Sequence, residues 1–331
     1  MRDGERLTIA ITRTGIPGFC PSRVWPSAEL REWPETTPPT PGELAELLAP
    51  ADGLLCQSSD QIGVELLDRC PRLRVVSTMS AGTDHLDLPA LADRRIAVGH
   101  TPDIPTEATA DLTFALILAA RRRLVEASRW VRQGHWTTTE LNGFIGQDVH
   151  GATLGIIGYG AIGRAVARRA TGFAMPVIQH SRRGESDHLA RWVPLDELLR
   201  TADVVSLHTP LTRETRHLIG ARELTMMKPT SVLVNTARGG VVDPHALRHA
   251  LMTGGIAAAA LDVMDVEPPG PGNPLVSAEN CIVIPHIGSA TYAARQRMAE
   301  LAVANLDKGL RGEHMLYPVP INSTISPLPQ R

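Results

Sequence analysis

Short apolar runs alternate with helical stretches in the N-terminal third of the chain. One of the helices is marked by Thr40-Pro41-Gly42-Glu43, a capping box with proline at the first helical position, and is expected to run to about Ala49. Strands that alternate with helices are typical of a small α/β domain with a parallel sheet. The predicted strands are Leu7–Thr12, Gly53–Cys56, Arg74–Met79 and Ile96–Val98.

Two proline-containing segments interrupt this pattern. The stretch from Pro17 to Pro41 is rich in proline and is expected to be irregular chain. The segment Thr101–Pro105 must be extended, because proline disfavours helix for the residue before it. With Thr106 as the expected N-cap of the long helix that follows, this segment predicts a crossing between two domains.

A second alternating series begins at residue 151. Helical stretches separate most of its strands, and Asp243-Pro244 is typical of an N-cap followed by proline at the first helical position. Strands in this order predict a doubly wound Rossmann sheet. The six predicted strands are Thr153–Ile157, Pro176–His180, Asp203–Leu207, Ser231–Asn235, Ile256–Leu261 and Ile282–Ile284.

Length and composition agree with a two-domain globular enzyme. The chain has 331 residues, of which 43% are hydrophobic and 21% charged, and its net charge of −2 gives no sign of a nucleic-acid or membrane partner. The longest apolar run, around Phe114–Ala120, is far shorter than the roughly 20 residues that span a bilayer. A cytoplasmic location is therefore expected. The four cysteines are scattered without a metal-binding motif, so no metal site is predicted.

The clearest chemical motif is Gly158-Tyr159-Gly160-Ala161-Ile162-Gly163. It follows the apolar run Leu154–Ile157 and opens the amphipathic stretch Ala161–Thr171, which Gly172 is expected to end. Glycines at these positions permit a tight turn and let a pyrophosphate approach the backbone at a helix N-terminus. A glycine-rich turn without a cofactor is the alternative, but the strand-to-helix context favours a dinucleotide site.

The residues after the next strand indicate which nicotinamide coenzyme is bound. An NAD enzyme usually places a carboxylate there for the ribose 2′-hydroxyl. Here the strand Val177–His180 is followed by Ser181-Arg182-Arg183, a hydroxyl and two guanidinium groups that could hold a 2′-phosphate. NADP(H) is therefore the preferred coenzyme, with NAD(H) possible. The alternative is that the two arginines are a solvated surface pair.

Three residues just past later strands form a candidate catalytic set, since an open parallel sheet binds ligands at that edge. Arg238 could hold an anionic oxo acid, and His286 could donate a proton as hydride arrives. A carboxylate would keep that imidazole protonated. Glu267 is the candidate for this role, and Asp262 and Asp265 compete with it on sequence alone.

These motifs, in this order and spacing, resemble the D-isomer-specific 2-hydroxyacid dehydrogenase family. The resemblance extends from about Leu7 to Asn322, and Leu73–Asp87 and Gly309–Glu313 are similar to its glyoxylate/hydroxypyruvate reductase branch. The segments that carry the family resemblance are Gly158–Gly163, His208–Thr212, Asn235–Gly240, Leu261–Pro268 and Pro285–Thr291.

The resemblance implies roles for individual residues. Arg238, Glu267 and His286 would be the catalytic trio. The substrate carboxylate would be bound by backbone amides near Ala81 and Gly82, with Arg238 and Ser289. Besides the glycine motif and Ser181-Arg182-Arg183, the cofactor site would include Thr109, His208, Thr209, Pro210, Thr215, Thr236, Ala237, Asp262, His286 and Gly288.

The resemblance also implies a fold of two Rossmann-like or flavodoxin-like domains, each with a doubly wound parallel sheet. Residues 1–104 and 292–331 would form a discontinuous substrate-binding domain, and residues 105–291 the NAD(P)-binding domain. The last helix, about Tyr292–Leu310, would return to the first domain after a second crossing near Ser289–Thr291. The active site would lie in the cleft between the domains, and the chain would form a homodimer through the cofactor domain.

The expected activity is NADPH-dependent reduction of glyoxylate and hydroxypyruvate to D-2-hydroxy acids. A reductase of larger 2-oxo acids is an alternative, because the loop Thr137–Gly143 has no aromatic residue where that branch carries bulky ones. A nucleotide-sensing corepressor of the same fold is an alternative from another class. Such a protein would need neither the trio nor a site for the substrate carboxylate.

Overall fold

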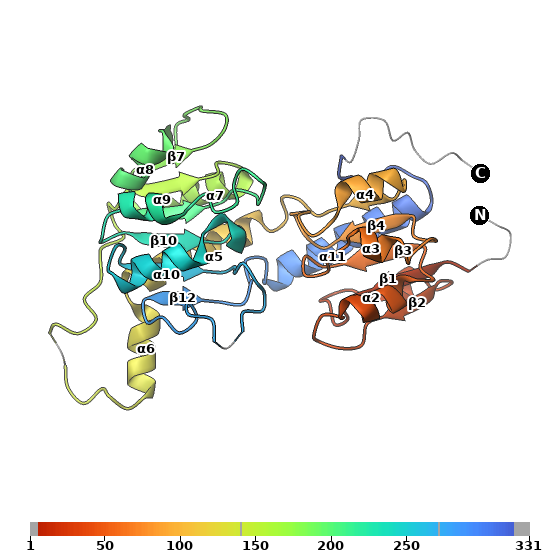
Figure 1. Cartoon of the computed structure of the whole chain (residues 1–331), viewed down its shortest axis with the longest axis horizontal. Coiled ribbons are helices and arrows are strands. Elements are labelled where there is room, and N and C mark those ends of the chain that lie inside the picture. Colours follow the sequence, from red (N-terminus) through yellow and green to blue (C-terminus); the bar gives the residue numbers. More distant parts are fainter. Residues whose placement is uncertain (1–5, 140, 271, 321–331) are drawn as a thin grey trace. The chain divides into compact units, whose positions relative to one another are not determined.

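The chain folds as two compact units and passes from one to the other twice (Figure 1). The N-terminal unit contains Met1–Pro105 and Ala290–Arg331, and Thr106–Ser289 forms the other. The crossings thus lie at 105/106 rather than 104/105, and at 289/290 rather than 291/292. The computed structural model describes residues 6–139, 141–270 and 272–320. The outer parts of the expected first domain, residues 1–5 and 321–331, and residue 140 of the loop Thr137–Gly143 lie outside these ranges.

The N-terminal unit is built on a parallel sheet of five strands in the order β2-β1-β3-β4-β5. This is the flavodoxin-like order of a doubly wound fold, as the family resemblance implied. The strands are β1 (Thr8–Ile11), β2 (Glu29–Glu32), β3 (Gly53–Cys56), β4 (Val75–Thr78) and β5 (Ala97–Gly99).

Helices cover both faces of this sheet. Leucines of α2, α3 and α4 pack on one face, and α11 packs on the other, where Leu306 and Leu310 contact Gly53 of β3. The predicted capping box is present, since the Thr40 hydroxyl accepts from the Glu43 amide and the Glu43 carboxylate accepts from the Thr40 amide at 2.8 Å. The helices are α1 (Pro21–Val24), α2 (Pro41–Leu48), α3 (Val64–Leu67), α4 (Leu88–Asp93) and α11 (Tyr292–Leu310).

The proline-rich segment contains an unexpected strand. Residues 17–41 were predicted to be irregular, but β2 pairs in parallel with β1 at the edge of the sheet, and the short helix α1 precedes it. The side chains of Glu29-Leu30-Arg31-Glu32 are exposed or half-buried. Because an edge strand is held by backbone hydrogen bonds on one side, its side chains need no apolar pattern that the sequence could reveal.

The second unit is built on a parallel sheet of seven strands, in the order β12-β11-β10-β9-β6-β7-β8. Counted from β6, this is the Rossmann order with one further strand, which confirms the predicted sheet. The sequence missed β8, which has only two residues. The strands are β6 (Leu154–Ile157), β7 (Val177–His180), β8 (Arg191–Trp192), β9 (Val204–Leu207), β10 (Val232–Asn235), β11 (Ala258–Leu261) and β12 (Cys281–Val283).

Two groups of helices cover the faces of this sheet. Apolar residues of α5 and α7 pack on one face, and those of α8, α9 and α10 pack on the other. Within the described residues, no helix is long and apolar enough to cross a membrane. The helices are α5 (Thr106–Arg121), α6 (Leu124–Arg132), α7 (Ala161–Ala170), α8 (Leu195–Thr201), α9 (Ala221–Met226) and α10 (Pro244–Met252), with short 3₁₀ turns at Thr171–Phe173 and Gly239–Val241.

Two helix ends lie close to their expected places. Thr106 is the first helical residue of α5 rather than its N-cap. Helix α7 ends at Ala170 with Thr171 as C-cap, directly before Gly172, and a 3₁₀ turn over Thr171–Phe173 follows. Helix ends fray and often close as a 3₁₀ turn, so differences of one or two residues are ordinary.

Candidate active site

The three glycines of the dinucleotide motif have three different surroundings. Gly158 has φ 94°, and a Cβ there would lie 2.5 Å from the carbonyl carbon and oxygen of His208. A Cβ at Gly163 would clash with the carbonyl oxygen of Gly158, so this glycine lets α7 pack closely against the turn. Gly160, the N-cap of α7, faces open space. The turn therefore leaves room for a phosphate at the unpaired amides of the first helical turn, and it fits a dinucleotide.

The side chain of Tyr159 takes no part in binding a phosphate at this turn. Its ring is buried, and its hydroxyl donates to the Asp187 carboxylate at 2.9 Å. Burial, together with Asp187, raises the pKa of Tyr159 to about 12. Tyr159 therefore anchors the segment before β8, and only its backbone, like the backbone of Ala161 and Ile162, belongs to the phosphate turn. Asp187 was not identified from the sequence, since nothing local pairs it with a tyrosine.

The residues predicted to select the coenzyme follow β7 directly. The Ser181 carbonyl accepts from the Trp192 indole at 3.1 Å and from the Gly184 amide at 3.2 Å, which closes a tight turn. Arg182 and Arg183 are exposed on this turn. The charge of Arg182 acts on Glu214, whose pKa it helps to lower. Both arginines are exposed and can be reached by an anionic ligand.

The loop after β9 lies beside Gly158. Burial lowers the pKa of His208 to about 3, so this imidazole is neutral at ordinary pH, and its Nε2 lies 2.8 Å from the Ser206 hydroxyl. The Thr215 hydroxyl donates to the Pro210 carbonyl at 2.6 Å, which fixes the loop that also carries Thr209. These side chains shape one wall of the predicted cofactor site.

Asp262 holds the loop that carries His286. Its buried carboxylate accepts from the amides of Ile287 at 2.6 Å and Gly288 at 2.8 Å. Burial raises its pKa although both amides lower it. The carbonyl of Gly288 in turn accepts from the Thr109 hydroxyl at 3.2 Å, which ties the loop to α5. Asp262 is thus engaged with backbone amides rather than with the imidazole of His286.

Glu267 is the carboxylate that contacts His286. Nδ1 of His286 lies 2.7 Å from Oε2 of Glu267, and the Met264 amide donates to Oε1 at 2.9 Å. Burial alone would raise the pKa of Glu267, but the hydrogen bond and charge of His286, the Met264 amide and the charge of Arg238 together lower it. The two side chains remain about one-third exposed, so a ligand can reach the pair.

The turn that carries Arg238 is fixed from both sides. Asn235 donates from Nδ2 to the Arg238 carbonyl at 2.9 Å and accepts from the Ala237 amide at 3.0 Å. Gly239 packs directly on the backbone of Met264, and a Cβ there would clash with it. The turn after β10 and the loop of Glu267 are therefore in contact. Asn235 was missed as a functional residue, although its place at the end of a strand was a usable signal.

The remaining predicted residues lie in both units. The Thr236 hydroxyl is 3.0 Å from that of Thr113 on α5. Ser289 is the last residue of the second unit. Ala81 and Gly82 belong to the N-terminal unit, in the loop after β4, where the Ala81 carbonyl lies 3.0 Å from Nδ1 of His100.

Comparison with known proteins identifies the family. Residues 114–288 match the family described as D-isomer specific 2-hydroxyacid dehydrogenase, NAD binding domain. The chain belongs to this family. It is therefore an NAD(P)-dependent D-2-hydroxyacid dehydrogenase with a nicotinamide cofactor, as the sequence motifs predicted.

Individual family members are similar over most of their length. The glyoxylate reductase of Korarchaeum cryptofilum is 44% identical over 310 residues, which cover 92% of this chain and 93% of that protein. Glyoxylate/hydroxypyruvate reductase B of Shigella boydii is 44% identical and covers 84% of this chain and 87% of its own. The structure of the NADPH-dependent glyoxylate/hydroxypyruvate reductase of Sinorhizobium meliloti, in complex with NADP and malonate, superimposes with a TM-score of 0.81 at 31% identity, over 96% of this chain and 98% of that one.

Proposed function

We propose that this dehydrogenase reduces small 2-oxo acids, glyoxylate and hydroxypyruvate foremost, to D-2-hydroxy acids with NADPH. The observation that carries the proposal is the 2.7 Å contact between His286 and Glu267, beside the turn of Arg238. The names of the relatives from Korarchaeum cryptofilum and Shigella boydii support the choice of substrates. A nucleotide-sensing corepressor would not need an imidazole that is held by a carboxylate in this way.

Each member of the trio has one task in this reaction. The bound coenzyme supplies a hydride to the carbonyl carbon of the substrate. His286 donates its proton to the carbonyl oxygen, which becomes the hydroxyl of the product. Glu267 stabilises the protonated imidazole and fixes the ring through Nδ1, which leaves Nε2 to face the substrate. Arg238 binds the substrate carboxylate.

Residues of both units would take part in binding. In the second unit, Arg238 and Ser289 would bind the carboxylate of the oxo acid. A role for the backbone amides of Ala81 and Gly82 in the N-terminal unit is implied by the family resemblance. The second unit would bind the coenzyme through the phosphate turn and the loop after β9. The side chain of His208 would take part as a neutral wall, because burial lowers its pKa to about 3.

NADPH would be preferred to NADH because of the turn after β7. Arg182 and Arg183 are exposed, and Ser181 stands where an NAD enzyme usually has an acid. A 2′-phosphate would gain charge-assisted hydrogen bonds there. The structure of the Sinorhizobium meliloti relative in complex with NADP supports this choice.

The chain would act as a cytoplasmic homodimer on a small-molecule substrate, with neither nucleic acid nor membrane as a partner. Helix α6 has no buried residue, and Leu124, Val125 and Val131 are exposed on it. The segment after α6 exposes Trp136 and Ile145 as well. Apolar side chains concentrated on one exposed helix and its continuation are typical of a protein–protein interface, and a second copy of this chain is the proposed occupant.

A direct assay tests the proposal. The purified protein is mixed with NADPH and glyoxylate or hydroxypyruvate, and oxidation of NADPH is followed by absorbance. We expect turnover with both acids and none without an oxo acid. Tight binding of NADPH without turnover on either acid would contradict the proposed substrates and would favour the nucleotide-sensing alternative.

A further inference from the structure

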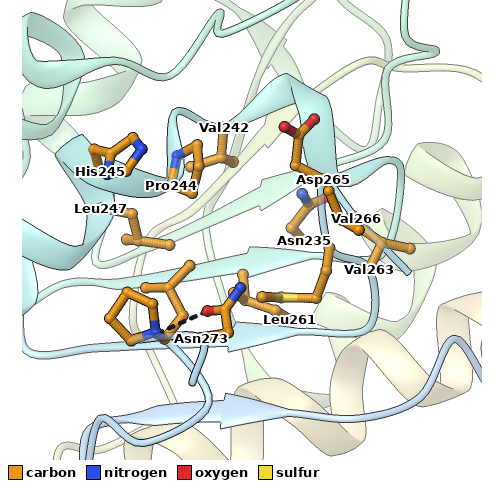
Figure 2. Close-up of a pocket in the computed structure, with 14 residues that line it drawn as sticks. Asn235, Val242, Pro244, His245, Leu247, Leu261, Val263, Asp265, Val266 and Asn273 are labelled. Carbon is orange, nitrogen blue, oxygen red and sulfur yellow. Dashed lines mark hydrogen bonds between the residues drawn. The ribbon is translucent and has the colours of Figure 1, made fainter. Parts of the chain in front are cut away.

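A pocket in the second unit lies apart from the coenzyme turn (Figure 2). It has a volume of about 260 Å³ and opens between the start of α10 and the loop after β11. Figure 2 shows Leu247, Leu261 and Val263 lining it. Asn235, Gly239, His245, Met264 and Asp265 also line it. Most of this surface is apolar, so the pocket fits an apolar ligand.

The pocket is on the opposite side of the sheet from Asp262. Leu261 packs with residues of α8, α9 and α10, whereas Asp262 holds the loop that is tied to Thr109 on α5. Leu261, the last residue of β11, and the loop residues Val263 and Met264 line the pocket, whereas the Asp262 carboxylate is held by the amides of Ile287 and Gly288. A molecule in this pocket therefore does not compete for the residues around Asp262.

Residues that line the pocket nevertheless also hold the loops that carry Arg238 and Glu267. Asn235 lines the pocket and holds the Arg238 turn through two hydrogen bonds. Met264 also lines it, and the Met264 amide holds Oε1 of Glu267 at 2.9 Å. Gly239 brings the two loops into contact, since it packs on the Met264 backbone. Any ligand that fixes or shifts this wall acts on both Arg238 and Glu267.

The lining of the pocket restricts the chemistry of its ligand. Asp265 is exposed at the rim and forms an ion pair with Arg216 at 3.8 Å, so its charge is balanced there. The lining is otherwise mostly apolar, and burial of an unpaired carboxylate against it would be unfavourable. The oxygens of Asp265, together with exposed His245 on α10, can accept a hydrogen bond from a neutral donor. The pocket thus favours an uncharged ligand over the anionic oxo acids that are the proposed substrates.

We propose that this pocket is a second binding site, for a small uncharged molecule that is mostly apolar and carries one hydrogen-bond donor. Its occupancy changes the rate of reduction through Asn235 and Met264. The effect on rate rests on the proposed catalytic function, but binding does not.

Benzyl alcohol is the probe for this site, and benzoate is its anionic counterpart of similar size. Methyl-labelled protein with bound NADPH is titrated with each compound, and methyl NMR signals of Leu247, Val263 and Met264 are followed. We expect benzyl alcohol to shift these signals and benzoate to leave them unchanged. In His245→Trp, which fills the rim, the shifts should be lost. In Leu247→Phe, which fills the interior, the remaining shifts of Val263 and Met264 should be lost. Met252→Trp, on the exposed side of the same helix, is the matched control and should retain them.

The second readout is kcat for glyoxylate at saturating benzyl alcohol. We expect a change of about five-fold or more, the lower end of ordinary coupling between two sites, that disappears in His245→Trp. An absence of methyl shifts, or equal shifts with benzoate, would overturn the site. Binding with an unchanged kcat would overturn the coupling. If the protein reduces no oxo acid, the NMR titration still tests binding on its own.

Discussion

His286 adopts a left-handed backbone conformation, with φ 50°, and its amide donates to the carbonyl of Asp262 at 2.9 Å. A residue other than glycine pays about 1–3 kcal/mol for such a conformation, and surrounding contacts must impose it. The contacts here are the three hydrogen bonds from residues 286–288 to Asp262. These bonds hold the backbone in the conformation from which the imidazole contacts Glu267, as expected for a preorganised site.

Replacement of His286 by alanine should abolish most reduction. Loss of a general acid typically costs about 10²–10⁴-fold in rate, and no other histidine contacts Glu267 among the described residues. Steady-state kcat with glyoxylate measures the loss, and fluorescence titration with NADPH should show nearly unchanged binding. His249→Ala, an exposed histidine on α10, is the control. A kcat for His286→Ala close to that of the unmodified enzyme would disprove the assignment.

Replacement of Glu267 by glutamine should lower kcat and change the shape of the pH profile of reduction. The hydrogen bond and charge of His286 lower the pKa of Glu267, so the carboxylate stays ionised in its contact with His286 until the pH falls below the usual range of a glutamate. A glutamine amide carries no charge and does not titrate, so kcat should fall at all pH values and the loss of activity due to protonation of Glu267 at low pH should disappear. The measurement is kcat against pH, with the exposed Glu279→Gln as control. A profile that scales down without any change of shape would mean that Glu267 acts only structurally.

The coenzyme preference should depend on the turn after β7. A charge-assisted hydrogen bond contributes roughly 1.5–3 kcal/mol, so the double replacement Ser181→Asp and Arg182→Ala should reduce the preference for NADPH by about ten-fold or more. The ratio of kcat/KM for NADPH and NADH measures it. Arg191→Ala, on neighbouring β8, should leave the ratio unchanged. Equal kcat/KM for the two coenzymes in the unmodified enzyme would refute the proposed preference.

The sequence predicted the strands that are buried on both faces, such as Gly53–Cys56, because their apolar runs are bounded by polar residues. It missed β2 and β8, which are edge strands with exposed or half-buried side chains. Pattern reasoning depends on burial, and an edge strand can form from backbone pairing alone. The alternation of strands and helices predicted parallel sheets, since parallel strands require crossovers. The flavodoxin-like order of the first sheet was implied by the family resemblance and depends on β2, which the pattern did not reveal.

The candidate site was predictable only where a side chain has a characteristic chemistry. The glycine motif and Arg238, Glu267 and His286 stand out in the sequence. The choice among the three acids stayed open, because the distance from His286 to each of them is a property of the folded loops. The support given by Asn235 and by the Met264 amide was invisible for the same reason. Backbone donors carry no signature in the residue sequence.

Replacement of Gly239 by alanine should impair both stability and catalysis. A Cβ at this position would clash with the backbone of Met264 and Asp265, and overpacking of this kind typically costs about 1–3 kcal/mol. Thermal unfolding should shift down by several degrees, and kcat should fall because the Arg238 turn is displaced. Gly172→Ala, which meets open space at an ordinary φ, is the matched control. Wild-type kcat in Gly239→Ala would show that the two loops are not mechanically linked.

The last prediction concerns the size of the substrate. Glyoxylate and hydroxypyruvate need an anchor for the carboxylate and a small space beyond C2. Arg238 and the amides of Ala81 and Gly82 would provide that anchor for any 2-oxo acid. The loop Thr137–Gly143, which the structure describes except at residue 140, has no aromatic side chain to fill the space beyond C2 if it borders that space.

An apolar substrate side chain that enters such a space gains roughly 0.8 kcal/mol for each buried CH₂ group. We therefore expect measurable reduction of phenylpyruvate besides that of the two small acids. The measurement is kcat/KM with NADPH along the series glyoxylate, hydroxypyruvate, 2-oxobutyrate and phenylpyruvate. A steep fall after hydroxypyruvate would show that other residues close the far side of the site. Activity on the larger acids alone would instead place the enzyme among reductases of larger 2-oxo acids, with the roles of Arg238, Glu267 and His286 unchanged.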